Sequence, residues 1–276
     1  MTFDRPPQDH SPGRDHVLQP PGLTDRIAGQ AVIEKLLSDR EGVPPRSFLR
    51  RVFGADPLSP DEYPWYKGAL GEIAVGRLLE RLGPEWAVLH AVPVGAGTSD
   101  IDHVLIGPAG VFTLNTKNHA GQSVWVAGRT LMVAGKKQRH LYNASYEATR
   151  AAKLLTRKVN EPVEVTGVVV VVAPKSLTVR ERPSGVAALT DRQLLRWLSG
   201  RPNILTPRQI VEITAAAVEP GTWHSKPTDM MAPSFLRFEF AKLRTLVDSA
   251  RRRRAGWLLA LIIGAPLILA TFSAYL

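Results

Sequence analysis

The chain has 276 residues, of which 44% are hydrophobic, so it can bury one medium-sized core with further segments around it. It contains no cysteine, which excludes disulfides and thiolate metal sites and is consistent with a reducing compartment. The formal net charge is +10, but four positive charges lie together at residues 251–254. For the rest of the chain, a nucleic-acid-binding surface and a merely solvated basic surface therefore both stay open.

The N-terminal part predicts a tail followed by helices. Residues 1–22 contain five prolines and no apolar core of a signal peptide, so we expect a disordered tail. Residues 23–62 predict a helical N-terminal extension, because apolar side chains recur at helical spacing after Thr24, which can cap a helix. The strongest helix prediction is 65–82, which carries an apolar stripe of Leu70, Ile73, Ala74, Leu78, Leu79 and Leu82.

The pattern then changes to strands that alternate with helices. Strands are predicted at 86–92, 101–106, 111–116, 123–126, 130–133 and 163–173, and helices at 143–159, 191–198 and 207–218. The unbroken valine run at 168–172 favours a strand buried on both faces. Residues 63–218 therefore predict an α/β domain with a mixed sheet flanked by helices.

The C-terminal part predicts a membrane anchor. Residues 219–254 are expected to form a linker and a basic juxtamembrane helix. Residues 255–276 carry no charge and measure about 33 Å as a helix, enough to cross a hydrocarbon core of about 30 Å. A transmembrane helix is the expectation, with a buried C-terminal helix as the alternative. The arginines before it would keep the preceding domain on the cytoplasmic side.

Acidic and basic residues in the first part of the α/β domain suggest hydrolysis of a phosphodiester. Asp102 is expected on one strand of a hairpin and Lys117 on the returning strand, near Asn115. Such chemistry needs charge neutralisation and an activated water, and Lys117 would polarise that water or steady the developing charge. Glu72, on the preceding helix, can converge on the same place.

At these residues the chain resembles the nuclease-related domain family, a branch of the PD-(D/E)xK nuclease superfamily. The resemblance covers residues 63–172 and rests on Gly71-Glu72, on Ile101-Asp102-His103 with Gly107, and on the segment from Gly110 to Lys117.

The resemblance implies that Glu72 and Asp102 hold Mg²⁺ or Mn²⁺ and that Lys117 is the catalytic lysine. The family pattern places an acid two residues before the lysine, where this chain has Asn115. An amide offers a metal a neutral oxygen and no charge, so metal affinity should fall. Glu147 on the following helix is a further polar residue expected to face the site.

Basic residues after the hairpin are candidates for holding nucleic acid. They are Arg129, Lys136, Lys137 and Arg139, and a solvated face is the equal alternative. His103 is expected on the opposite face from Asp102, in a packing or a solvent role. His119 is expected on a loop surface, with substrate contact as the alternative.

The sequence thus supports a membrane-anchored, metal-dependent nuclease that acts on DNA or RNA and needs no small-molecule cofactor. A catalytically degenerate nucleic-acid-binding module is the first alternative, because of Asn115. A membrane-anchored scaffold is the second.

Overall fold

The computed structural model describes residues 22–95, 99–224 and 231–273, with side chains in the last helix described to Gly264. The tail expected at 1–22 thus lies outside the described residues except for its last position. In chain order the elements are η1 (Leu23–Asp25), α1 (Gln30–Ser38), α2 (Phe48–Val52), α3 (Glu62–Leu79), β1 (Ala87–Pro93), β2 (Asp100–Gly107), β3 (Gly110–Asn118), β4 (Ser123–Ala127), β5 (Thr130–Val133), β6 (Lys136–Gln138), α4 (His140–Val159), β7 (Val165–Val172), β8 (Ser176–Glu181), β9 (Val186–Thr190), α5 (Asp191–Ser199), α6 (Pro207–Val218), α7 (Pro220–Trp223) and α8 (Pro233–Ser273).

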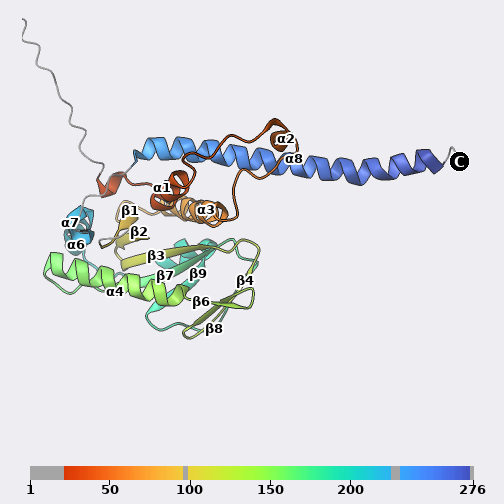
Figure 1. The fold of residues 1–276 in the computed structure, drawn as a ribbon. Coiled ribbons are helices and arrows are strands. Elements are labelled where there is room, and N and C mark those ends of the chain that lie inside the picture. The colour runs from red at the N-terminus through yellow and green to blue at the C-terminus, as the bar shows by residue number, and fades with distance from the viewer. Residues whose placement is uncertain (1–21, 96–98, 225–230, 274–276) are drawn as a thin grey trace, which may run out of the picture.

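The main sheet has five strands in the order β1-β2-β3-β7-β9 (Figure 1). The first three strands are antiparallel, and β3, β7 and β9 are parallel. Gly107 pairs with Gly110 across the β2–β3 turn, so the hairpin turns at Pro108-Ala109 as predicted. The valine run of β7 is inaccessible to solvent from Val168 to Val171, which confirms a strand covered on both faces.

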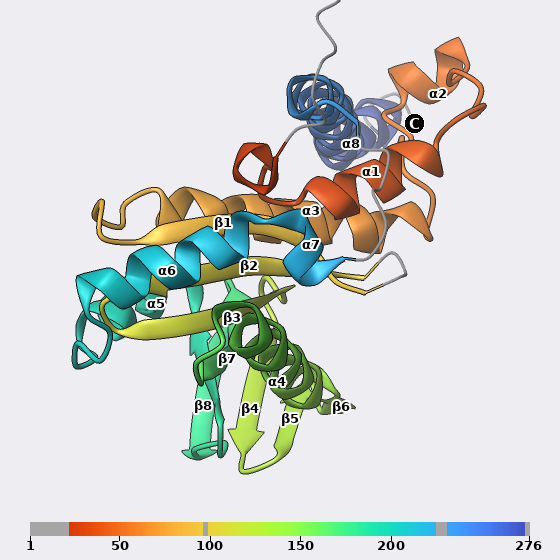
Figure 2. The ribbon, with the colours of Figure 1, turned by 90° about the vertical axis from the view of Figure 1, so that its left-hand side faces the viewer.

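A second mixed sheet, ordered β6-β5-β4-β8, projects below the main one (Figure 2). The expectation of a single mixed sheet is therefore wrong. The cause is β8, which pairs in parallel with β4 and draws the β4–β5 hairpin away from the main sheet. Five of the six β8 residues are exposed, so its sequence lacks the apolar alternation that marks a strand.

Helices cover both faces of the main sheet (Figure 2). α3 and α5 pack on one face through a shared cluster that includes Val75, Leu194 and Phe112. α4 and α6 pack on the other face through Leu155 and Ile213. The place where β2 begins and β3 ends lies between these two layers of helices, and it holds the predicted site.

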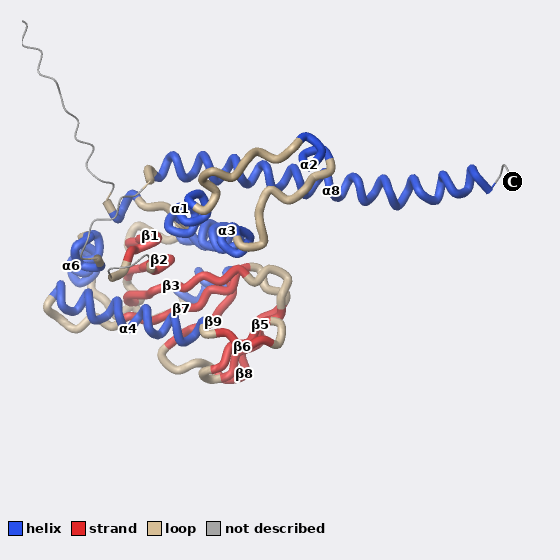
Figure 3. The backbone as a smooth tube through the Cα atoms, in the orientation of Figure 1, coloured by secondary structure: helices blue, strands red, loops and turns tan. Residues whose placement is uncertain are grey.

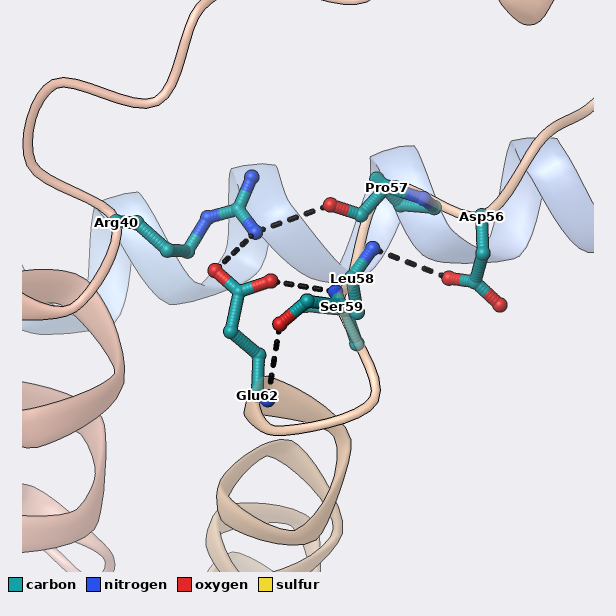
Figure 4. A network of polar contacts seen from close by, with 6 residues as sticks. All are labelled: Arg40, Asp56, Pro57, Leu58, Ser59 and Glu62. Atoms are coloured by element: carbon teal, nitrogen blue, oxygen red, sulfur yellow. Dashed lines mark hydrogen bonds and ion pairs between the residues drawn. The ribbon is translucent and has the colours of Figure 1, made fainter.

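The start of α3 is fixed by a network of polar contacts (Figure 4). Ser59 and Glu62 exchange hydrogen bonds between side chain and backbone, at 2.6 and 3.2 Å, in the manner of a capping box. Arg40 donates to Glu62 Oε1 at 2.9 Å and to the carbonyl oxygen of Pro57 at 3.1 Å. These bonds hold the helix that presents Glu72.

α8 is one continuous helix through the arginine run (Figure 3). Its first part packs on α1 and α3, with Leu236 and Phe240 buried and the Phe240 ring 5.6 Å from that of Tyr66. Further along, the Trp257 indole donates to the carbonyl oxygen of Val52 in α2 at 3.0 Å. The residues expected to begin a membrane span therefore contact the N-terminal extension.

The predicted membrane anchor is not borne out. Among the residues described, no helix combines the length and the hydrophobicity that crossing a bilayer requires. Beyond the arginines, α8 continues to Ser273, and its side chains are described to Gly264. The transmembrane helix at 255–276, the membrane as a partner, and the membrane-anchored, cytoplasm-facing location were thus wrong expectations; positions 274–276 lie outside the described residues.

Candidate active site

β2 and β3 separate where the site was predicted. Their ladder ends at His103 opposite Leu114, although β2 continues against β1 and β3 continues against β7. Beyond that point, the backbone N–H of Thr116 donates to Oδ2 of Asp102 at 2.5 Å. The Asp102 carboxylate thus lies in the gap between two neighbouring strands.

α3 brings Glu72 to this gap. A Cβ on Gly71 would lie 3.1 Å from the Cβ of Asn118, so glycine lets the helix lie close against β3. Glu72 is 4% exposed. Burial, and then the Asp102 carboxylate, raises the pKa of Glu72 well above its usual range.

Two aspartates on β2 share this environment. Burial raises the pKa of Asp102, against the opposing effects of the Lys117 ammonium and of the hydrogen bond from Thr116. Burial and the neighbouring Asp102 raise the pKa of Asp100 to about 7, although the Arg26 guanidinium opposes the shift. Near neutral pH, Asp100 therefore holds a proton in part of the molecules, whereas an exposed aspartate would have released it.

Lys117 brings a positive charge to the cluster. Its ammonium lowers the pKa of Glu72 and of Asp102, which places it electrostatically among the carboxylates. Two histidines border it on the other side, with Nε2 of His119 and Nε2 of His140 3.0 Å apart. Burial, and then Lys117, lowers the pKa of His140 to about 4.

Asn115 is tied to the helix on the opposite face of the sheet. Its Nδ2 donates to Oε1 of Glu147 on α4 at 2.6 Å. Burial raises the pKa of Glu147 to about 7, against the effect of this hydrogen bond. Glu147, named in the sequence only as a residue facing the site, is thus a direct partner of the residue that departs from the family pattern.

The cluster has the donor chemistry of a site for a hard cation. Among the buried oxygens without a hydrogen-bond partner in the described residues are Glu72 Oε2, Asp100 Oδ2, Asn115 Oδ1 and Glu147 Oε2. Within the described ranges, no three carboxylates or imidazoles are arranged so that they alone could hold a metal ion. Mg²⁺ commonly takes one or two carboxylates and completes its shell with water and substrate oxygens, so the residues fit such an ion.

The predicted nucleic-acid-binding residues lie outside this cluster. Arg129 is in the β4–β5 turn, Lys136 and Lys137 are on β6, and Arg139 precedes α4; all four are exposed. The Arg139 guanidinium lies 4.8 Å from the centre of the Tyr142 ring. They form a basic border on the second sheet and at its connection to α4.

Of the two histidines whose positions were predicted, one lies as expected and one does not. His103 is inaccessible to solvent, with Nδ1 2.8 Å from Nδ1 of His90, which confirms a packing role. His119 is partly buried and contacts His140, so it is not an ordinary loop-surface residue. His140 and Arg26 were not identified from the sequence, because neither lies near a motif.

Comparisons with known proteins agree with the place of this site. Residues 67–172 match the family model described as nuclease-related domain. A segment of 69 residues is 42% identical to an uncharacterized protein of Bacillus anthracis, and it covers 24% of this chain and 31% of that relative. The chain thus spans less than a third of the length of that relative. No solved structure matches the chain significantly.

Proposed function

Residues 67–172 belong to the nuclease-related domain family of the PD-(D/E)xK nuclease superfamily, and on this basis we propose that the chain is a metal-dependent nuclease that hydrolyses DNA or RNA phosphodiesters. The observation that carries the proposal is the cluster at the strand separation. Glu72, Asp102 and Lys117 come there from α3, β2 and β3 and act on one another electrostatically.

The carboxylates would hold the ion. Glu72 and Asp102 supply charged oxygens, and the unpartnered Oδ1 of Asn115 supplies a neutral one. A bound Mg²⁺ or Mn²⁺ would neutralise phosphate charge and make a coordinated water more acidic. The raised pKa values of the carboxylates imply that cation binding displaces protons and strengthens with pH.

Lys117 would act on the attacking water and on the charge that develops at phosphorus. Lys117 lies on β3, which pairs in parallel with β7 at this position, so the backbone that carries the ammonium is held in place. A positive charge held in advance stabilises the transition state without reorganisation.

The proposal is tested with the full chain and labelled single- and double-stranded DNA and RNA, in Mg²⁺, in Mn²⁺ and in EDTA. We expect cleavage that requires metal and that falls about 100-fold or more in Lys117→Ala and Asp102→Asn. Lys242→Ala, which removes an exposed positive charge from α8, is the matched control and should cleave normally. Absence of cleavage in both metals, or equal cleavage by all variants, would remove the nuclease.

A non-catalytic nucleic-acid-binding module is the second candidate, and Asn115 favours it. The amide nitrogen is held by Glu147, so this position contributes a hydrogen bond where the family pattern has a charge. If chemistry has been lost, the wild type should bind nucleic acid in a salt-dependent way without cleaving it. Asn115→Asp should then create metal-dependent cleavage; a wild type that already cleaves excludes this candidate.

A further inference from the structure

We propose that α4 carries a platform for an unpaired nucleic-acid strand, formed by Tyr142 and Tyr146 between Arg139 and Arg150 and adjoining the candidate active site. The proposal rests on the proposed function in one respect, because it takes the ligand to be nucleic acid. It adds the substrate class, a single strand rather than a duplex. We call these four residues the tyrosine platform.

The two tyrosines are unusually accessible for large aromatic side chains. Tyr142 is 57% exposed and Tyr146 is 59% exposed. They are four residues apart, so they lie on one side of α4, about 6 Å apart along its axis. Two rings on one side of a helix can therefore each meet a base of the same strand.

The platform leads directly to the carboxylates. Tyr146 and Arg150 line the same 140 Å³ pocket as Asp100 and Glu147. Both tyrosines belong to the helix that covers this side of the sheet, as Figure 2 shows for α4. A strand lying on the rings would thus pass beside the cluster that holds Lys117.

The charges around the rings favour a polyanion. The Arg139 guanidinium lies over the Tyr142 ring at 4.8 Å. Arg150 is packed against the backbone of Gly95, where an added Cβ would come 2.1 Å from its Nη2. α4 also carries three more cations, and its one acidic residue is Glu147. Positive groups thus flank the aromatic surface along the helix.

The aromatic surface itself points to unpaired bases. In a duplex the base faces are stacked on one another and only their edges reach the grooves, so a tyrosine ring meets no base face. In a single strand each base offers a free face, and stacking on an aromatic ring is strong and tolerant of sequence. Arginine side chains alone would bind the phosphates of a duplex and of a single strand alike. The two tyrosine rings are what favours the single strand.

Fluorescence anisotropy with a labelled oligothymidylate and a duplex of the same length tests the platform, in EDTA and low salt so that cleavage does not intervene. We expect the double variant Tyr142→Ala/Tyr146→Ala to bind oligothymidylate about tenfold more weakly, with duplex binding little changed. Both side chains are exposed, so the variant should fold, which circular dichroism checks. Phe238→Ala, which removes a 66% exposed ring from α8, is the matched control.

Tyr142→Phe/Tyr146→Phe keeps the rings and removes the hydroxyls, so it should bind as the wild type does. The platform is overturned if the alanine variant binds oligothymidylate normally, if the phenylalanine variant loses as much as the alanine variant, or if the wild type prefers duplex. Binding of neither nucleic acid would also overturn it and leave the rings to a protein partner. Because this experiment measures binding, its outcome is separate from that of the cleavage assay. A wild type that binds the single strand without cleaving it refutes only the nuclease. An alanine double variant that still binds and cleaves normally refutes only the platform.

Discussion

Replacing Glu147 by glutamine should stabilise the metal-free protein, and the gain should depend on pH. Glu147 is a partly buried carboxylate that accepts one hydrogen bond, from Asn115, and shares its surroundings with Asp102. Glutamine has nearly the same shape and keeps an oxygen for Asn115, but it carries no charge. The substitution therefore isolates the cost of ionising this position.

The magnitude follows from the raised pKa. Burial moves the pKa of Glu147 from 4.5 to about 7, and each unit is worth about 1.4 kcal/mol, so ionisation costs the folded state about 3 kcal/mol at pH 8. The folded protein binds this proton more tightly than the unfolded chain does. The contribution of Glu147 to stability is therefore lost as the pH rises from about 4.5 to about 7. Below that window the carboxyl is protonated in both states and the cost vanishes.

Urea unfolding of wild type and Glu147→Gln at pH 5 and pH 8, in EDTA, measures the effect. We expect the variant to gain about 1 kcal/mol at pH 5 and about 3 kcal/mol at pH 8. Histidines with lowered pKa values, such as His103, contribute equally to both proteins and cancel. Glu41→Gln, which neutralises an exposed carboxylate, is the control and should stay within about 0.5 kcal/mol. An equal gain at both pH values, or a loss at pH 8, would refute the reasoning.

Two further substitutions test how the site and the C-terminal helix are held. Gly167→Ala would bring a Cβ to 2.5 Å from the carbonyl oxygen of Ala144, so α4 must move away from β7. Urea unfolding should show a loss of about 2 kcal/mol or more in the free energy of unfolding. Gly256→Ala, whose added Cβ meets open space, should show no loss. Trp257→Ala removes the hydrogen bond to Val52, so trypsin should cut the arginines of α2 faster while Tm stays nearly constant, and an unchanged digestion rate would contradict the contact.

The sequence predicts those helices and strands whose hydrophobic pattern matches their burial in the fold. The valine run of β7 could be placed because it is buried on both faces, and the β2–β3 hairpin because its turn is marked by Gly107 and Gly110. The second sheet could not be predicted, since β8 is exposed and exists through its pairing with β4. A basic helix up to residue 254 and a helix from residue 255 were predicted as separate elements. The structure joins them in α8, because arginine is a good helix former and no glycine precedes Gly256 there.

For the site, motifs indicated the residues and the tertiary fold supplied their partners. Glu72, Asp102 and Lys117 were identified from motif order, and the structure brings them together; their roles remain predictions. Gly29 and Arg26 affect the pKa values of Glu72 and Asp100 because the N-terminal extension packs closely against α3. At the contact, a Cβ added to Gly76 would come 2.5 Å from the Cβ of Ala28. Such packing leaves no periodic trace in sequence.

The charges around position 115 explain why an amide rather than a carboxylate can occupy it. Four carboxylates, those of Glu72, Asp100, Asp102 and Glu147, face the cations of Lys117 and Arg26, which leaves two negative charges when all are ionised. That is the charge of one divalent ion. An acid at position 115 would add a fifth buried carboxylate, whereas Asn115 donates a hydrogen bond that lowers the pKa of Glu147. Once Glu147 is ionised, α4 can thus supply the charge absent from β3, which weighs against the non-catalytic module that Asn115 alone would indicate.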